Sequence, residues 1–278
     1  MSIGGVVDLF RGAPRHEVGD GGRMSLSDHF RELRARLMRS VLYLVVGTVI
    51  AFFFWHQLFE LIYRPYADAT DLLGKNVKSE AVITGVGSPL MLQLKLCSIA
   101  AIVATSPLWL MEIWGFIVPG LHPKERRWTR VFVAVAGPLF IAGVALGYYI
   151  LPKGIATLIG FTPLGLTQLT EFSDFFTFIT RMLIIFGVSF EIPLFIVLLN
   201  MAGVLPGRTL AKYRPFIIVG VFVFAAVATP STDPYSMTFL AIPMTLLVMA
   251  SEVVSRILDR RRGRGGTNQW DDDVASPL

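Results

Sequence analysis

Cysteine and charged residues are scarce in this 278-residue sequence. Cys97 is the single cysteine, so no disulfide can form within the chain, and no CxxC metal or redox pattern exists. Charged residues make up 16% of the chain, whereas soluble domains carry about 25%. This shortage of charge, together with long apolar runs and a mean hydropathy of +0.62, indicates a membrane protein.

Catalytic and metal-binding motifs are also missing. The sequence has no HExxH, P-loop or GxSxG pattern. An intramembrane serine protease would need a histidine within a span, but no histidine lies in the middle of an apolar run (the four are His16, His29, His56 and His122). We therefore predict a protein that is not an enzyme and that binds no metal or cofactor.

Six apolar segments account for most of the chain, which is 54% hydrophobic. They lie at about residues 40–57, 88–118, 129–151, 174–201, 215–230 and 235–252. Only helices and closed barrels satisfy their own backbone in lipid, and no alternating pattern suggests a barrel. We predict an all-α polytopic membrane protein with six transmembrane helices. Prolines inside four of the segments predict kinked helices and a concave wall (Pro107, Pro138, Pro193 and Pro243).

Lysine and arginine are distributed unequally between the connecting segments. They cluster before the first apolar segment, between the second and third, between the fourth and fifth, and after the sixth. The positive-inside rule then places both termini in the cytoplasm. The net charge of +5 is thus explained by membrane orientation, and we expect no nucleic-acid partner. Residues 1–24 are predicted to be a flexible cytoplasmic tail, 25–257 the membrane domain and 258–278 a disordered cytoplasmic tail.

Two carboxylates lie where apolar segments begin, on the predicted cytoplasmic side. Glu32 belongs to an amphipathic helix expected over residues 25–41, where a local pair with Arg36 would explain it. Glu125 follows Pro123 and would lie in the first turn of the third transmembrane helix, where the helix dipole favours a negative charge. Spacing alone favours these local explanations over a binding role.

Glu191 is different, because it lies inside the fourth apolar segment. A carboxylate there is costly, so it either hydrogen-bonds to a neighbouring helix as a neutral group or faces a cavity or partner. Lys95 and Arg181 are further charges within the segments. These three residues support an alternative function, a proton-coupled secondary transporter of small solutes. Against it, residues 40–151 and 174–252 show no convincing repeat.

Several stretches, in this order and spacing, resemble the TatC family, the polytopic core subunit of the twin-arginine protein translocase. The similarity runs from about residue 25 to 257 and is carried by HFRELRARL, SPLMLQLKL, SPLWLMEIWGFIVPGLHPKERR, GVSFEIPLFIVLL, KYRPFIIVGVFVFAAVATPSTDP and LAIPM. The resemblance implies a glove-like arrangement of six tilted helices with both termini cytoplasmic, and no catalytic activity.

The resemblance also implies a function. Proteins of this family bind the twin-arginine signal peptides of folded precursor proteins. They work in a multimeric complex with TatA and, in some bacteria, TatB, in the cytoplasmic membrane. Export draws on the proton-motive force. We expect the same function, partners and location for this chain, with lipid as its surroundings.

Residue by residue, the resemblance assigns two groups of sites. Glu32 and Glu125 match the carboxylates that receive the two arginines, while Arg34 and Phe116 match positions that the family needs beside them. Glu191 matches the acidic residue on the concave face. The remaining matches are structural, periplasmic or partner-contacting positions, namely Pro65, Pro107, Tyr148 and Asp233. The sequence departs from the family at Met237, where a glutamine is common, which weakens any polar contact expected there.

Overall fold

The computed structural model describes residues 26–73, 78–121, 126–163, 167–229 and 234–261. The tail predicted over 1–24 lies outside this part of the chain. Helices dominate the described residues, and one pair of short strands accompanies them. The elements are α2 (Leu26–Phe53), α3 (Trp55–Leu73), β1 (Lys78–Val82), α4 (Ser88–Ala104), α5 (Ser106–Leu121), α6 (Arg126–Gly160), β2 (Thr167–Glu171), α7 (Phe172–Met201), α8 (Gly207–Lys212), α9 (Arg214–Ala228) and α10 (Pro234–Arg261).

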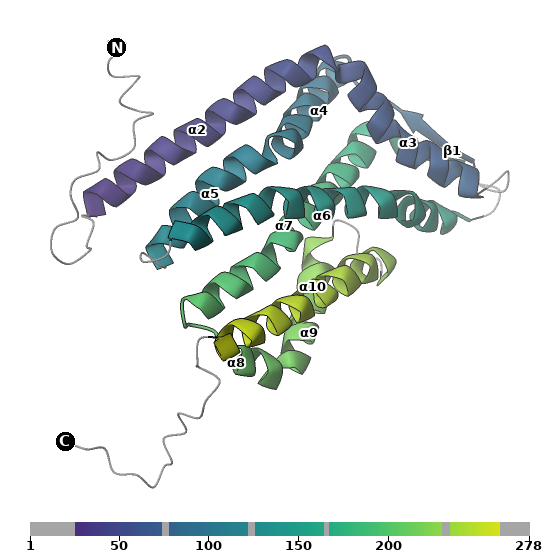
Figure 1. Cartoon of the computed structure of the whole chain (residues 1–278). Coiled ribbons are helices and arrows are strands. Elements are labelled where there is room, and N and C mark those ends of the chain that lie inside the picture. Colours follow the sequence, from purple (N-terminus) through teal and green to yellow (C-terminus); the bar gives the residue numbers. More distant parts are fainter. Residues whose placement is uncertain (1–25, 74–77, 122–125, 164–166, 230–233, 262–278) are drawn as a thin grey trace, which may run out of the picture.

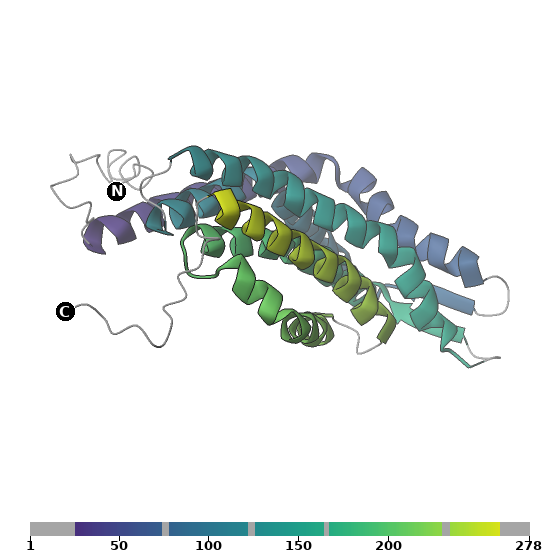
Figure 2. The ribbon, with the colours of Figure 1, turned by 60° about the horizontal axis from the view of Figure 1, so that its bottom comes forward.

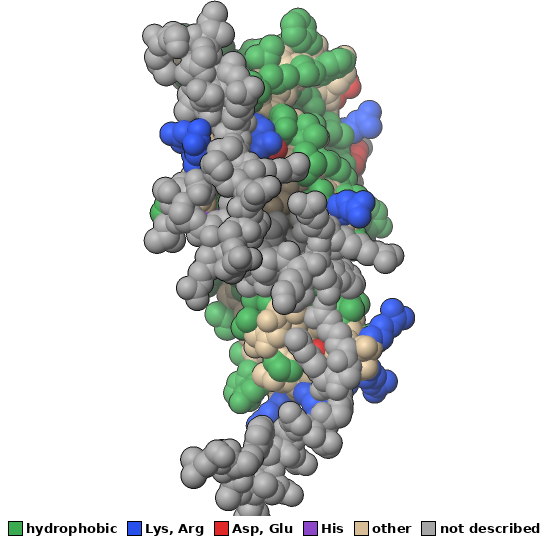
Figure 3. All heavy atoms as spheres, turned by 60° about the vertical axis from the view of Figure 1, so that its left-hand side comes forward, with side chains coloured by type: hydrophobic (Ala, Val, Ile, Leu, Met, Phe, Trp, Pro, Cys, Tyr) green, Lys and Arg blue, Asp and Glu red, His purple; other side chains and the backbone are tan. Residues whose placement is uncertain are grey.

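The long helices lie side by side and tilted, so that the molecule has two distinct ends (Figures 1 and 2). One end, here called the basic end, gathers the start of α2, the junction of α5 and α6, helix α8 and the end of α10. Lysine and arginine side chains lie around it (Figure 3). The opposite end, here called the strand end, carries α3 and the parallel pair β1–β2, in which Lys78 faces Thr167 and Val82 faces Glu171.

Four helices of the described chain are long and apolar enough to cross a membrane, and the bent pair α4–α5 makes a fifth if its two helices form one broken span. Helix α9 is apolar but has only 15 residues, about 22 Å at 1.5 Å per residue. The protein is therefore a multi-pass, all-α membrane protein. The count of six spans remains a prediction, as does the compartment that each end faces.

Helix α2 joins the amphipathic segment and the first apolar run in one continuous helix. It ends at Phe53, and a second helix, α3, follows from Trp55. The predicted first segment, 40–57, crosses this break. Composition could not reveal it, because the aromatic run around residue 54 is apolar on both sides of the turn. Helix α3 instead buries one face, through Ile62, Tyr66 and Ala69.

The second apolar segment bends by 57° between α4 and α5, at Thr105. Pro107 lacks an N–H group and so leaves the carbonyl of Val103 without its helical donor. The hydroxyl of Ser106 donates to that carbonyl at 2.7 Å. The indole Nε1–H of Trp109 donates to the carbonyl of Ile102 at 2.9 Å. The interruption expected at Pro107 thus lies two residues earlier. Neighbouring side chains donate hydrogen bonds to the backbone carbonyls at the break.

Helices α6 and α7 form the centre of the core through small residues facing aromatic rings. A Cβ at Gly143 of α6 would lie 2.6 Å from the carbonyl oxygen of Phe186 on α7. A Cβ at Gly187 of α7 would lie 2.7 Å from the ring of Phe140 on α6. Because only hydrogen fits at these points, the two helices approach closely and fill the space with buried phenylalanine rings.

Two helices extend beyond the predicted segments. Helix α6 continues from the expected limit at 151 to Gly160, where Ile155 and Ile159 are buried. Helix α10 continues to Arg261, so the prediction that residues 258–278 form a disordered tail begins too early. Asp259 accepts hydrogen bonds from Asn200 Nδ2 at 3.0 Å and from the backbone N–H of Gly207 at 2.7 Å. These tertiary contacts hold the polar last turns of α10 in place.

Candidate functional site

Glu32 lies on α2 at the basic end and already binds a guanidinium. Its Oε1 accepts hydrogen bonds from Nη2 of Arg36 at 2.7 Å and from Nε at 2.9 Å. The Glu32 side chain remains 26% exposed. The local pair expected from spacing is therefore present, and the carboxylate is still open to solvent at the end of the molecule.

A second carboxylate, Glu112 of α5, lies beneath this pair and was missed by the sequence analysis. It is only 5% exposed. Its Oε2 lies 3.4 Å from Arg36 Nη1 and 3.3 Å from Arg39 Nη2, and its backbone carbonyl accepts a 3.3 Å hydrogen bond from Arg36. The reasoning applied to Glu191, a lone carboxylate within an apolar segment, could have identified Glu112.

Arg36 thus bridges two acids, and the chain leaves room for it. A Cβ at Gly115 of α5 would lie 2.5 Å from Nη1 of Arg36, so a larger residue there would displace the guanidinium. We name the group Glu32, Arg36, Arg39 and Glu112 the α2–α5 charge cluster. It contains two carboxylates and two guanidiniums, so its formal charges balance.

Phe116 lies next to this cluster. Its ring stacks on the imidazole of His29, with centroids 4.5 Å apart and planes at 27°. His29 and Glu32 are three residues apart on α2, so they share a helix face. Arg34 is exposed on the same helix, and Glu125 lies outside the described residues. The structure therefore brings Glu32 and Phe116 to one end of the α2–α5 contact.

Glu191 on α7 is held by a hydrogen bond to another helix. The indole Nε1–H of Trp114, on α5, donates to its Oε2 at 2.9 Å. Its other oxygen, Oε1, is buried and has no partner among the described residues. The Trp114 ring also contacts Phe132 of α6 and Phe195 of α7. The interhelical bond that was one explanation of Glu191 is present, and its place on the concave face stays a prediction.

Tyr148 and Pro65 are parts of one arrangement near the strand end. Pro65, inside α3, has no N–H and so leaves the carbonyl of Leu61 without its helical donor. The hydroxyl of Tyr148, on α6, donates to that carbonyl at 2.8 Å. Tyr148 thus supplies the hydrogen bond that Pro65 removes, although the two residues lie 83 positions apart in the sequence. Pro107 contacts α6, since a Cβ added at Gly137 would lie 2.8 Å from the proline ring. Asp233 lies outside the described residues.

A second buried acid that the sequence analysis missed connects α9 to α10. Glu252 is 4% exposed. Arg214 donates to both of its oxygens, at 2.8 and 3.1 Å, and Arg256 Nη2 lies 2.6 Å from Oε1. Such a two-pronged arginine–carboxylate pair fixes the rotation of α9 against α10.

Comparisons with known proteins agree with one another. A family model described as Sec-independent protein translocase protein (TatC) matches residues 28–243. The TatC protein of Frankia casuarinae is 38% identical over 275 residues, covering 95% of this chain and 75% of the relative. That of Deinococcus radiodurans is 37% identical over 233 residues, covering 84% of this chain and 86% of the relative.

Solved structures give the same result. A crystal structure of the twin-arginine translocase receptor TatC superimposes with a TM-score of 0.69 at 30% identity, covering 82% of this chain and 99% of that chain. A second one gives 0.68 at 29% identity, covering 82% and 98%.

The helical membrane fold and these matches define a class first: a non-enzymatic, multi-pass component of a protein translocase. Within that class, the chain belongs to the TatC family. The predicted family and the fold class are confirmed. Membership also decides against the alternative of a small-solute transporter.

Proposed function

We propose that this chain is the receptor subunit that binds twin-arginine signal peptides of folded precursor proteins. The observation that carries the proposal is the partly exposed carboxylate of Glu32, which holds a guanidinium at the basic end beside the ring of Phe116. A group that binds one guanidinium in this way has the chemistry to bind another.

Binding would proceed by exchange. Arg36 occupies Glu32 through Nε and Nη2, and its Nη1 is already directed towards Glu112. A guanidinium of the incoming peptide would replace Arg36 at Glu32, while Arg36 would keep Glu112 as its counter-ion. Arg36 and Arg39 would then share Glu112, so the cluster would gain one positive charge but each guanidinium would still lie against a carboxylate.

The second arginine would bind Glu125, which directly precedes α6 in the chain. The stacked rings of His29 and Phe116 would offer an apolar surface to the peptide. Arg34 is exposed on α2, two residues from Glu32, and would belong to the same signal-peptide site.

The remaining partners and the location belong to the same proposal. The chain would lie in the cytoplasmic membrane of a bacterium with both termini inside, in a multimeric complex with TatA and, where present, TatB. Export would use the proton-motive force. Glu191 would contact a bound helix on the concave face, and Pro65, Tyr148 and Asp233 would belong to the periplasmic, partner-contacting part of the chain.

Site-specific photo-crosslinking tests the proposal. A photoreactive residue at position 29, three residues before Glu32, or at position 124, next to Glu125 in the sequence, keeps both carboxylates and should crosslink a twin-arginine peptide. The same residue at exposed position 80, at the strand end, should not. The Glu32→Arg variant should bind the peptide about 10- to 100-fold more weakly, the loss expected for a charge-assisted hydrogen bond. Wild-type export by Glu32→Arg, with no crosslink at either position, would refute the proposal.

A further inference from the structure

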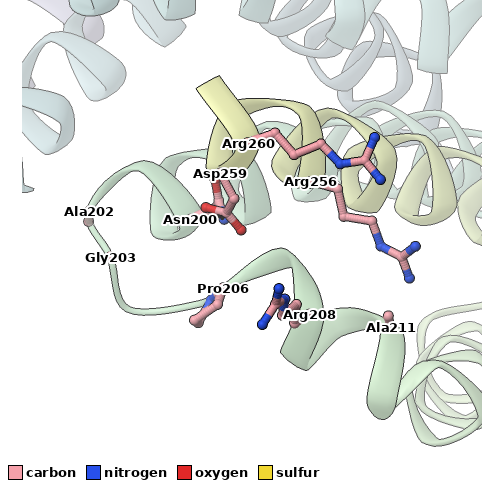
Figure 4. Close-up of a pocket in the computed structure, with 9 residues that line it drawn as sticks. All are labelled: Asn200, Ala202, Gly203, Pro206, Arg208, Ala211, Arg256, Asp259 and Arg260. Atoms are coloured by element: carbon pink, nitrogen blue, oxygen red, sulfur yellow. Dashed lines mark hydrogen bonds between the residues drawn. The ribbon is translucent and has the colours of Figure 1, made fainter. Parts of the chain in front are cut away.

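A pocket of about 690 Å³ opens at the basic end, away from the α2–α5 charge cluster. It lies between α8 and the last turns of α10 (Figure 4). Three arginines line it, Arg208 from α8 and Arg256 and Arg260 from α10. Asn200 and Asp259 lie together on one side, and Arg208 lies across from them.

The length of α10 would place the pocket at the depth of lipid head groups. Arg256 follows Pro234, the first residue of α10, by 22 positions, which is about 33 Å along the helix. The hydrocarbon core of a bilayer is about 30 Å thick. A helix that begins at one membrane surface would therefore bring Arg256 and Arg260 to the phosphates of the other leaflet.

The pocket carries an excess of positive charge. Glu252 pairs with Arg256 at 2.6 Å and offsets one guanidinium. The oxygens of Asp259 are engaged by Asn200 Nδ2 and by the backbone N–H of Gly207. Asp259 therefore fastens the α7–α8 connection to α10. The lining of the pocket holds three arginines and one aspartate, a composition that favours an anion in this space.

Asn200 supplies a second, independent signal. The residue is 1% exposed and lines the pocket. Its Nδ2 donates to Asp259 Oδ1 and to the carbonyl of Leu205, which fixes the orientation of the amide. Its Oδ1 is buried without a partner among the described residues. A buried acceptor of this kind calls for a hydrogen-bond donor.

We propose that this pocket binds the head group of an anionic phospholipid of the leaflet at the basic end, a phosphoglycerol lipid in particular. The phosphate would bind among the guanidiniums of Arg208, Arg256 and Arg260, and a glycerol hydroxyl would donate to Asn200 Oδ1. Basic pockets between membrane helices bind phospholipid head groups in this way. The site is separate from the proposed peptide site and does not depend on it.

Native mass spectrometry of the full-length, detergent-purified chain tests the proposal. The protein is mixed with equal amounts of phosphatidylglycerol and phosphatidylcholine, whose head group has a phosphate but no donor. The Arg208→Gln/Arg260→Gln variant removes charge, and Ala211→Trp fills the pocket while every charge remains. Arg261→Gln, an exposed arginine that does not line the pocket, is the matched control.

The wild type and the Arg261→Gln control should retain phosphatidylglycerol in preference to phosphatidylcholine. The preference should fall about 10- to 100-fold in the double variant, and fall likewise in Ala211→Trp. Equal retention of the two lipids by the wild type, or an unchanged preference in Ala211→Trp, would overturn the proposal. Because Ala211→Trp keeps all arginines, it remains informative if the double variant fails to fold.

Two further arms identify the occupant. Inorganic phosphate at the concentration of the lipid should not displace phosphatidylglycerol; if it does, the site binds phosphate alone and the lipid assignment is wrong.

A chain shortened to residue 265 lacks the acidic residues 271–273. It should show the same lipid preference as the full chain. A preference that emerges only after shortening would mean that this acidic segment occupies the pocket, which would also overturn the proposal.

Discussion

Single residues in this protein compensate for the hydrogen bonds that prolines remove. Tyr148 supplies a donor for the carbonyl that Pro65 leaves unpaired, and Ser106 does the same for the carbonyl left by Pro107. In lipid no water is available, so the carbonyl of Val103, within the apolar pair α4–α5, must find a donor inside the protein. The prolines can therefore shape helices without leaving polar groups unpaired.

The Tyr148→Phe variant should lower the stability of the purified protein by about 0.5–1.5 kcal/mol, because the carbonyl of Leu61 loses its donor. In a Pro65→Ala background the backbone N–H is restored, so adding Tyr148→Phe should cost almost nothing. The thermal melting of the four proteins in a double-mutant cycle measures this coupling. Equal shifts in both backgrounds would show that the two residues are independent.

At the scale of elements, two buried glutamates connect helices at the basic end. Glu112 ties α5 to α2 through Arg36 and Arg39, and Glu252 ties α10 to α9 through Arg214 and Arg256. Both acids are about equally buried, and both pair with two arginines. In the proposed exchange, however, only Glu112 serves as the counter-ion of Arg36 when a peptide binds Glu32.

Replacing Glu112 by Gln should therefore weaken twin-arginine peptide binding roughly tenfold, since the contacts with Arg36 are long and lie at the weak end of charge-assisted bonds. Arg36 would then compete more strongly for Glu32. The matched control is Glu252→Gln, which should lower the melting temperature similarly and leave peptide affinity unchanged. Titration of a fluorescent peptide into each purified variant measures its affinity for the peptide. Equal losses of affinity in the two variants would point to a general structural effect.

At the scale of the whole molecule, the helices place the start of α2 and the end of α10 at one end and the strand pair at the other. The charge distribution predicts that the basic end faces the cytoplasm. This orientation governs both proposals, because signal peptides and the inner-leaflet lipid must approach from the same side.

Cysteine labelling in intact cells tests this orientation. Cys97 is fully buried and can be replaced by Ala to give a cysteine-free background. A cysteine introduced at exposed Glu80, at the strand end, should react with a membrane-impermeant maleimide. One at exposed Arg261 should react only after the membrane is opened. The reverse pattern would invert the topology and place the proposed peptide site outside the cell.

Much of the fold and part of the site could be predicted before the structure. The apolar runs identified the helical segments, and a shared face of α2 placed Glu32 with Arg36. Local composition did not reveal helix α3, the strand pair or the continuation of α10 to Arg261. Each of these depends on contacts with distant parts of the chain rather than on local composition.

The sequence by itself determined that this is a multi-pass helical membrane protein of the TatC family, because hydropathy acts locally and long motifs are specific. Only the tertiary structure decided which side chains meet. Glu112 contacts Arg36 across 76 positions, and Tyr148 contacts Leu61 across 87. The arginine pocket likewise joins α8 to α10. Such contacts depend on how each helix is rotated against its neighbour, and the packing of the whole core sets that rotation.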